Sequence, residues 1–529
     1  MSATPFADPT VRADTASRFD LRALVACSAA ALLAGLVYLN ALHNPFVYDD
    51  YHTVVANTSL QNVADVRAIV LHDITRPIVN FSYAIDRALW GAGPLGFHVT
   101  NVLLHVLNVI LLFQLAWRLV ENGQGRGITD RPIRAEVVAF ATASLFAVHP
   151  MMTEAVGYIS GRSEVLCATF FLLGMLSGRR WVRGDGAPWA MLTVGLWGAA
   201  LATKETAAMF PFVLFAYDGL TGHPSLARLN ASRGSNAERR RRVATLHLPL
   251  MATAAVLGIV RLIVLRIEYP GQVSVHWRYI LLELDVLRRY VWLLVNPAGQ
   301  ALFHEVAAVR SLFEPRVLFA VGASGLMLAL AWGLRRVERI ASLGIVWFLL
   351  LLVPSAALNV LDQGEPMAEH RVYLASCGVF LAAGSGVGRL GAWLARARAR
   401  TRWLGRAALA AVLVSFSVDT LFRNSVWADP VTLWRESVDL APTHFRPRLL
   451  LGEALQDAGR REEAIEQYRI AIRLRPTELT GYLKLGLCLA EMGRLDEARQ
   501  YLRQAIALDP QNEPARRSLA LLDMIRPAK

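Results

Sequence analysis

Eleven apolar runs, separated by short polar connectors, constrain this chain more than any other feature of its sequence. A backbone that crosses lipid must satisfy its own hydrogen bonds, so runs of about 20 apolar residues are expected to form membrane-spanning helices. The sequence therefore predicts an all-α, polytopic membrane helix bundle over residues 21–422, preceded by a cytoplasmic tail at residues 1–20. The predicted spans are Leu21–Leu42, Phe97–Val120, Glu136–Val148, Glu164–Val182, Pro188–Thr203, Thr206–Leu220, Val243–Leu265, Arg316–Leu334, Ile340–Leu361, Val372–Leu390 and Leu404–Phe422.

A twelfth segment, His276–Pro297, is apolar at helical spacing but carries four charged residues. Each charge near the centre of a span would cost about 3 kcal/mol. An interfacial or cavity-lining helix avoids this cost. We therefore expect eleven spans rather than twelve, with the first run retained because no Ala-x-Ala-like cleavage site follows it closely.

The composition fits a membrane protein and argues against a nucleic-acid-binding protein. Hydrophobic residues make up 54% of the chain and charged residues only 18%, whereas a typical globular protein carries about 25% charged residues. The net charge of +13 comes from Arg residues between the apolar runs, where it favours anionic lipid. No nucleic-acid-binding motif accompanies them. The four Cys residues lack zinc-ligand or CxxC spacing and are expected to be small buried hydrophobic residues.

The charge of the connectors predicts the orientation of the bundle. Arg-rich connectors are expected in the cytoplasm, by the positive-inside rule. Alternation along eleven spans then places a long outer loop, residues 43–96, the turn around Glu154 and the C-terminus together on the outer side. The Arg-rich connectors are residues 121–134, 179–185, 221–242, 335–339 and 389–406.

The C-terminal part of the chain, residues 429–526, repeats with a period of thirty-four residues. Units 445–478 and 479–512 match at many positions, including the Leu-Gly pairs and the closing Pro residues. This period and pattern predict tetratricopeptide repeats, in which paired helices stack into a short solenoid. The solenoid is expected either to support the membrane domain or to bind an extended peptide in its concave face.

The sharpest candidate for chemistry is the acidic pair Asp49 and Asp50, in the motif FVYDDYH just after the first span. Adjacent carboxylates repel one another unless a proton or a cation intervenes. The plainer interpretation is a solvated pair of carboxylates that caps a helix. A base with its supporting acid, or a divalent metal site that includes Asp49 and Glu154, is the functional one.

Three further groups of charged residues are predicted at the same outer end. Glu154 lies in a tight turn between two spans, where a carboxylate must be paired, hydrated or metal-bound. Lys204 interrupts two apolar runs and is expected either to pair with Glu205 or to contact phosphate. The segment EHRVY contains His370, Arg371 and Tyr373, where Arg suits either a bound phosphate or the phosphate of a lipid headgroup.

The order of motifs resembles a known family. NPFVYDDYH is followed by RPIVNFSYAIDRALWG, GFHVTNVLLHVLN, HPMMTEAVGYISGRSE, ATKE, EHRVYLAS and then the repeats. This order is similar to that of the transmembrane-and-tetratricopeptide-repeat O-mannosyltransferases, which are C-type (GT-C) membrane glycosyltransferases. The array here is shorter than is typical of that family.

The resemblance implies a polyprenyl-phosphate sugar as donor, a protein or peptide acceptor, and a hexose such as mannose as the transferred group. It implies that Asp50 or Asp49 is the catalytic carboxylate, and that Glu154 is a second acid. Arg371 then contacts the donor phosphate, with help from Lys204 or Arg76. His370 and Tyr373 belong to the same predicted phosphate site. A divalent ion, Mg²⁺ or Mn²⁺, is a further expectation.

Three functional hypotheses follow. The first is an inverting glycosyltransferase on the outer face of a bacterial inner membrane, in which Asp50 removes the proton of the acceptor hydroxyl. The second is a non-catalytic scaffold that recruits envelope proteins through the repeats. The third is a lipid or polymer transporter, which is disfavoured because transporters place ionisable groups near the membrane midplane.

Overall fold

Each predicted apolar run forms a helix in the computed structural model, which describes residues 20–123, 133–221, 240–268, 277–360, 365–395 and 399–524. The tail 1–19 and most of the connectors 121–134 and 221–242 lie outside the described residues. The described residues form helices and connecting segments without a β-strand. The membrane-bundle helices are α1 (Leu21–Leu36), α4 (Pro94–Gly123), α5 (Ala135–Val148), α7 (Arg162–Val182), α8 (Ala187–Leu201), α9 (Phe210–Thr221), α12 (Leu248–Glu268), α14 (Pro315–Leu334), α15 (Arg339–Val360), α16 (Tyr373–Leu394) and α17 (Ala399–Val426).

The chain is a multi-pass membrane protein, although fewer helices reach spanning length than the eleven predicted. Within the described residues, eight helices are long and apolar enough to cross a membrane. A ninth span results if α5 and the short α6 (Thr153–Val156), which are bent by 60° at Pro150, count as one. The other two predicted spans, α8 and α9, have 15 and 12 residues because the polar segment at Lys204 separates them.

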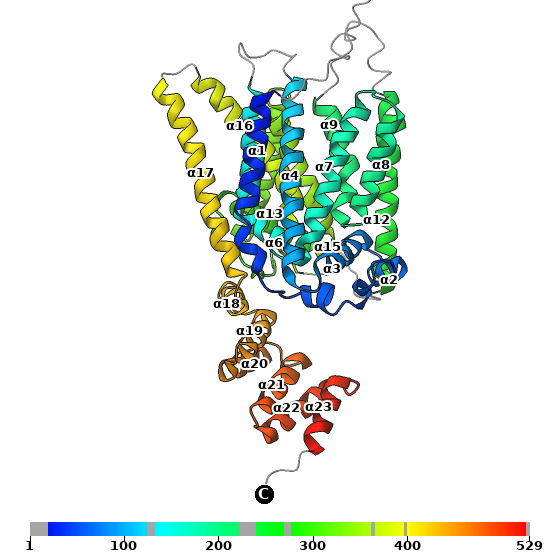
Figure 1. Cartoon of the computed structure of the whole chain (residues 1–529), viewed down its shortest axis with the longest axis vertical. Helices are drawn as coiled ribbons and strands as arrows, with labels where there is room; N and C mark the ends of the chain where they lie inside the picture. The colour runs from blue at the N-terminus through cyan, green and yellow to red at the C-terminus, as the bar shows by residue number, and fades with distance from the viewer. Residues whose placement is uncertain are drawn as a thin grey trace, which may run out of the picture.

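Arg side chains hold the junctions between elements at one end of the bundle. At one end Arg242 donates to the carbonyl of Val182 at 3.2 Å, which joins the start of α12 to the end of α7. At the same kind of junction, Arg389 donates to the carbonyl of Val337 at 2.9 Å. The opposite end holds the outer-loop helices α2 (Val66–His72) and α3 (Pro77–Trp90), and the C-terminal helices extend from it (Figure 1).

Small residues allow a close contact between helices α15 and α16. A Cβ atom on Gly344 would lie 2.2 Å from the carbonyl oxygen of Gly378. Helices in lipid gain little from the hydrophobic effect between them, so close van der Waals contact of this kind stabilises their association. This contact holds the first turns of α16, which directly follow the predicted phosphate-binding residues His370 and Arg371.

The ambiguous segment His276–Pro297 forms α13 (Trp277–Val295), which is not among the candidate spans. Its buried Asp285 accepts from Arg288 at 2.8 Å and from Arg289 at 3.1 Å. The charges therefore neutralise one another along one helix face. The structure agrees with the expectation of an amphipathic helix, and α13 packs against α14 and α15.

The outer loop is attached to the bundle by a buried ion pair. Asp86 of α3 lies 2.5 Å from Arg162 of α7, and both side chains are almost completely buried. Arg162 also donates to the side chain of Asn101 and to the carbonyl of Phe97, each at 2.7 Å. The positions of α3, α4 and α7 relative to one another are thereby fixed.

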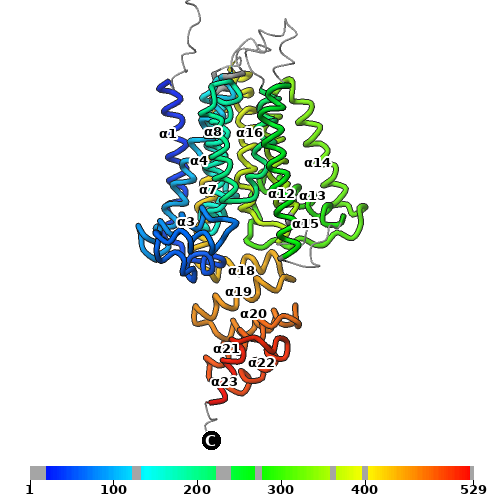
Figure 2. Tube along the Cα trace, turned by 90° about the vertical axis from the view of Figure 1, so that its right-hand side faces the viewer, coloured from blue at the N-terminus to red at the C-terminus, as the bar shows by residue number. Residues whose placement is uncertain are grey.

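The C-terminal helices form a separate column below the bundle (Figure 2). The pairs α19 (Phe445–Asp457) with α20 (Arg461–Leu474), and α21 (Leu479–Glu491) with α22 (Leu495–Leu508), coincide with the two predicted repeat units. Gly459 and Gly493 adopt positive φ values of 77° and 75° in the turns between the paired helices, as L-residues rarely do. Helices α18 (Pro430–Leu440) and α23 (Glu513–Met524) flank the array.

Candidate active site

Asp50 is buried and holds the turn that follows α6. Its Oδ1 atom accepts from the backbone N–H and the hydroxyl of Ser160, at 2.8 and 2.6 Å. Its Oδ2 atom accepts from the N–H of Val47 at 3.1 Å. Burial raises the pKa of Asp50 to about 7, although these hydrogen bonds act in the opposite direction. Asp50 thus joins the outer loop to the start of α7.

Asp49 faces solvent instead, although it is adjacent in sequence. Its backbone N–H donates to the hydroxyl of Tyr158 at 3.0 Å, and that hydroxyl also hydrogen-bonds the Asp49 side chain. His370, His52 and Arg446 are close enough to influence its carboxylate electrostatically. Of the two predicted acids, Asp49 is therefore the one whose carboxylate is open to an incoming molecule.

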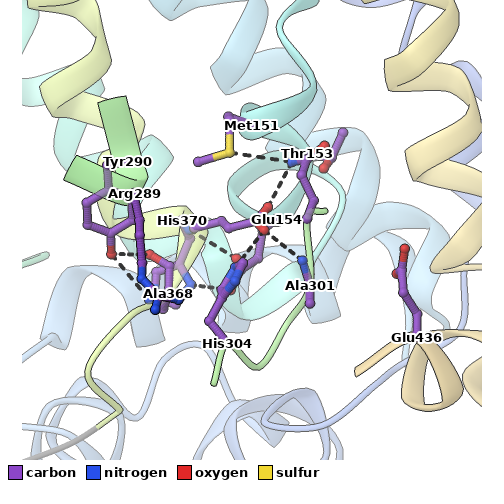
Figure 3. A network of polar contacts seen from close by, with 12 residues as sticks. Met151, Thr153, Glu154, Arg289, Tyr290, Ala301, His304, Ala368, His370 and Glu436 are labelled. Carbon is purple, nitrogen blue, oxygen red and sulfur yellow. Dashed lines mark hydrogen bonds and ion pairs between the residues drawn. The ribbon is translucent and has the colours of Figure 1, made fainter. Parts of the chain in front are cut away.

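Glu154 lies beside the start of α16, as the predicted site requires. His370 donates from its backbone N–H to Oε2 of Glu154 at 3.2 Å, and its Nδ1 atom lies 2.6 Å from Oε1. The Glu154 side chain is almost fully buried. This pair joins the turn between α5 and α7 to the EHRVY segment (Figure 3).

A second carboxylate in this network, Glu369, was not predicted as a site residue. It accepts from the N–H of Ala301 at 2.7 Å and from Gln300 at 2.8 Å, and it lies 2.9 Å from Nε2 of His304. Glu369 and Glu154 influence one another electrostatically, so the network holds two neighbouring acids. Its partners come from the non-helical segment after α13, where sequence periodicity gives no signal.

The predicted phosphate-binding cations gather around Glu205. Arg76 lies 3.5 Å from Glu205. Burial raises the pKa of Glu205, but the charges of Lys204, Arg76 and Arg371 outweigh burial, and the net pKa is lowered. Lys204 itself is buried and lies 2.6 Å from Glu164 of α7, rather than pairing with Glu205 alone. An anion that approaches this group would meet three cations and two carboxylates.

Arg371 and His370 lie at the edge of this group, whereas Tyr373 does not. Arg371 donates to the carbonyl of Glu365 at 2.7 Å. Tyr373 is buried, and its hydroxyl lies 2.8 Å from Nδ1 of His105 in the bundle interior. The prediction that Tyr373 contacts the donor phosphate is therefore corrected, because the first turn of α16 directs its ring into the core.

A metal site was expected at Asp49 and Glu154. Within the described ranges, no group of three or more His, Cys, Asp or Glu side chains is arranged to hold a metal ion. Glu154 is instead hydrogen-bonded to His370. The donor set does not fit Mg²⁺ or Mn²⁺, which prefer several oxygen ligands, and no step proposed below uses a metal.

Comparisons with known proteins match both parts of the chain. A tetratricopeptide repeat family model matches residues 449–513. The human Protein O-mannosyl-transferase TMTC1 is 27% identical over 84% of this chain and 55% of its own length. TMTC4 of Mus musculus is 25% identical, over 82% of this chain and 64% of its own length. The chain thus spans little more than half the length of the first of these relatives.

Among solved structures, ArnT from Cupriavidus metallidurans bound to undecaprenyl phosphate is similar with a TM-score of 0.39 and 15% identity. That similarity covers 91% of this chain and 79% of ArnT. Over more than four fifths of its length, this chain resembles the transmembrane-and-tetratricopeptide-repeat O-mannosyltransferases, as the order of its motifs predicted.

Proposed function

We propose that this chain is a membrane glycosyltransferase that moves a hexose such as mannose from a polyprenyl phosphate to a protein or other envelope acceptor. The observation that carries the proposal is the gathering of one exposed acid, Asp49, and a cation group at the same end of the bundle. His370 lies within electrostatic range of Asp49 and also of Arg76, Lys204 and Arg371, so the acid and the cations share one neighbourhood. The names of the relatives support the same reaction class.

Asp49 acts as the general base in this proposal, and Asp50 is its positioning residue. An acceptor hydroxyl has a high pKa and needs a base as its oxygen attacks the anomeric carbon. Both carboxylate oxygens of Asp50 are buried and already accept hydrogen bonds from Val47 and Ser160. Asp49 is exposed, so its carboxylate can take the proton.

The cation group acts on the leaving phosphate. As the new bond to the acceptor oxygen forms, the bond between the anomeric carbon and the phosphate oxygen breaks, and its electron pair leaves with the phosphate. The phosphate changes from a diester with one negative charge to a monoester with up to two. Arg371 and the half-exposed Arg76 are placed to stabilise that added charge, while Lys204, held by Glu164, contributes its field.

The attack comes from the side opposite the phosphate, so the anomeric configuration is expected to invert. The active site and the repeats share one end of the bundle, which we assign to the outer, periplasmic side of a bacterial inner membrane. The basic junctions at Arg242 and Arg389 occupy the other end, as the positive-inside rule requires of the cytoplasmic side.

Mass spectrometry of envelope glycans tests the proposal in cells that lack this chain. Loss of a hexose from a defined acceptor is expected. The wild-type chain and the matched variant Asp65→Asn should restore it, because Asp65 only caps α2 in the same outer loop and Asn caps equally well. Asp49→Asn should not restore it. An unchanged glycan profile in the deleted strain, or full restoration by Asp49→Asn, would overturn the proposed function.

A further inference from the structure

The first helix after the membrane domain, α18, packs against Tyr48, the residue that precedes the acidic pair. Trp434 of α18 contacts the ring of Tyr48 edge to face, with centroids 5.7 Å apart. Phe303, from the segment after α13, lies 5.7 Å from Tyr48 and 6.0 Å from Trp434. Three aromatic side chains from three distant parts of the sequence therefore enclose the residue before Asp49.

Polar contacts reinforce this junction on both sides. Thr443 donates to Glu305 at 2.8 Å, which joins the start of the repeat array to the segment that follows α13. Arg446 of α19 lies 3.3 Å from the carboxylate of Glu365. The carbonyl of Glu365 accepts from Arg371 at 2.7 Å. One residue thus contacts both the repeat array and a proposed phosphate-binding residue.

Arg446 also reaches the acidic pair itself. Its side chain interacts with the hydroxyl of Tyr48, and its charge acts on the carboxylate of Asp49. Tyr48 has a φ of 49°, the only positive value among the described non-glycine residues. A bulky residue keeps such a conformation only where its surroundings impose it, and these positions concentrate at functional sites.

We propose that the repeat array completes the active site, with Arg446 as a positioning residue that holds Tyr48 and Glu365 and thereby sets Asp49 and Arg371 for transfer. The inference deepens the proposed function and depends on it. The array then acts in the reaction itself, in addition to any acceptor that it binds. A short array suffices for this role, because the contacts come from α18 and the start of α19.

The pH dependence of activity distinguishes a positioning role of Arg446 from a purely structural one. Asp49 must be ionised to act as a base, and the titratable and charged groups around it are Asp50, His52, His370 and Arg446, with the hydroxyls of Tyr48 and Tyr158 close by. The charge of Arg446 favours the ionised form. Its removal should raise the pKa of Asp49 and move the acid limb of the profile to higher pH.

The test uses the full-length protein in proteoliposomes, with a mannosyl polyprenyl phosphate donor and a short Ser/Thr peptide. Arg446→Met should lower kcat about tenfold, leave the KM for the peptide within about twofold, and raise the acid limb by about 0.5 pH unit. Arg446→Lys should restore the pH limb. The control, Arg473→Met, removes a similar exposed pair with Glu466 on α20 and should behave as wild type.

A second variant, on the other side of the same ion pair, keeps the proposal testable if Arg446→Met does not fold. Glu365→Gln keeps the shape of its side chain but removes the ion pair, and it should also lower kcat. The proposal is overturned if both Arg446→Met and Glu365→Gln match Arg473→Met, or if Arg446→Met raises only the peptide KM with an unchanged pH profile. Failure of the proposed function would look different, because Asp49→Asn would then remain active.

Discussion

The carboxylate of Asp50 accepts two hydrogen bonds from Ser160, a residue 110 positions away, at 2.8 and 2.6 Å. This contact joins the outer loop to the turn that carries Glu154 and the start of α7. Since Asp49 is the adjacent residue, the position of its exposed carboxylate depends on the same contact. The adjacent acids are therefore assigned different tasks, with Asp50 holding the structure and Asp49 facing the substrate.

Removal of the Ser160 hydroxyl tests this assignment. Ser160→Ala keeps the backbone donor but leaves Asp50 with one hydrogen bond fewer, at a cost of about 1–3 kcal/mol for a buried acceptor. We expect a lower apparent Tm in detergent and slower sugar transfer. Ser425→Ala, which removes an exposed hydroxyl on α17, serves as the control. Equal behaviour of the two variants would show that the Asp50–Ser160 contact does not position the acidic pair.

The raised pKa of Asp50 predicts a pH-dependent stability. Its pKa is about 7 in the folded protein, against about 4 in an unfolded chain. The fold therefore favours the protonated form, and this contribution to stability is full below about pH 4 and is lost as the pH rises through about 7. As the pH rises from about 4 to about 7, the apparent Tm of the wild type should therefore fall relative to that of Asp50→Asn. A difference that is constant, or that shifts in favour of the wild type, would contradict the assignment.

Arg371 is expected to act through the shape of its guanidinium as well as its charge. Arg371→Lys keeps the charge but loses the planar donors that suit a phosphate. We expect kcat/KM for the donor to fall about 10- to 100-fold, equivalent to about 1.4–2.7 kcal/mol. Arg67→Ala, at an exposed position on α2, should leave it unchanged. Wild-type donor kinetics in Arg371→Lys would remove Arg371 from the phosphate site.

The buried pair of Asp86 and Arg162 should matter for stability rather than for chemistry. Arg162→Met leaves an uncompensated buried carboxylate, which typically costs about 3–5 kcal/mol. The double variant Asp86→Asn with Arg162→Met removes that charge and should recover part of the loss. Thermal unfolding of the purified variants checks this order, and a double variant less stable than the single one would contradict it.

The sequence predicted the helices well because their signals are periodic and local. The apolar runs and the thirty-four-residue repeat each appear as helices at the expected positions. The acidic pair, Glu154, Arg371, Lys204 and Arg76 lie at one end of the bundle, and their roles in a site stay predictions. Their actual partners were not predictable, since Lys204 forms an ion pair with Glu164, forty positions away, and also acts electrostatically on its neighbour Glu205.

Two features of the site could not be predicted from the sequence, for physical reasons. Glu369 and His304 form a buried network through a segment without regular structure, where no periodicity marks the contact. Tyr373 follows Arg371 by only two residues, yet a helical turn directs the two side chains to different surroundings. Their proximity in sequence predicted a shared site, but the helix geometry directs the two side chains to different surroundings.

Sugar transfer by the purified full-length protein tests the central claim most directly. Proteoliposomes would receive a mannosyl polyprenyl phosphate of known anomeric configuration and a Ser/Thr peptide, and mass spectrometry with NMR would follow the product. The account predicts a mannosylated peptide of inverted configuration from the wild-type protein, and almost none from Asp49→Asn. A folded Asp49→Asn protein that transfers mannose at the wild-type rate, or a product of retained configuration, would contradict it.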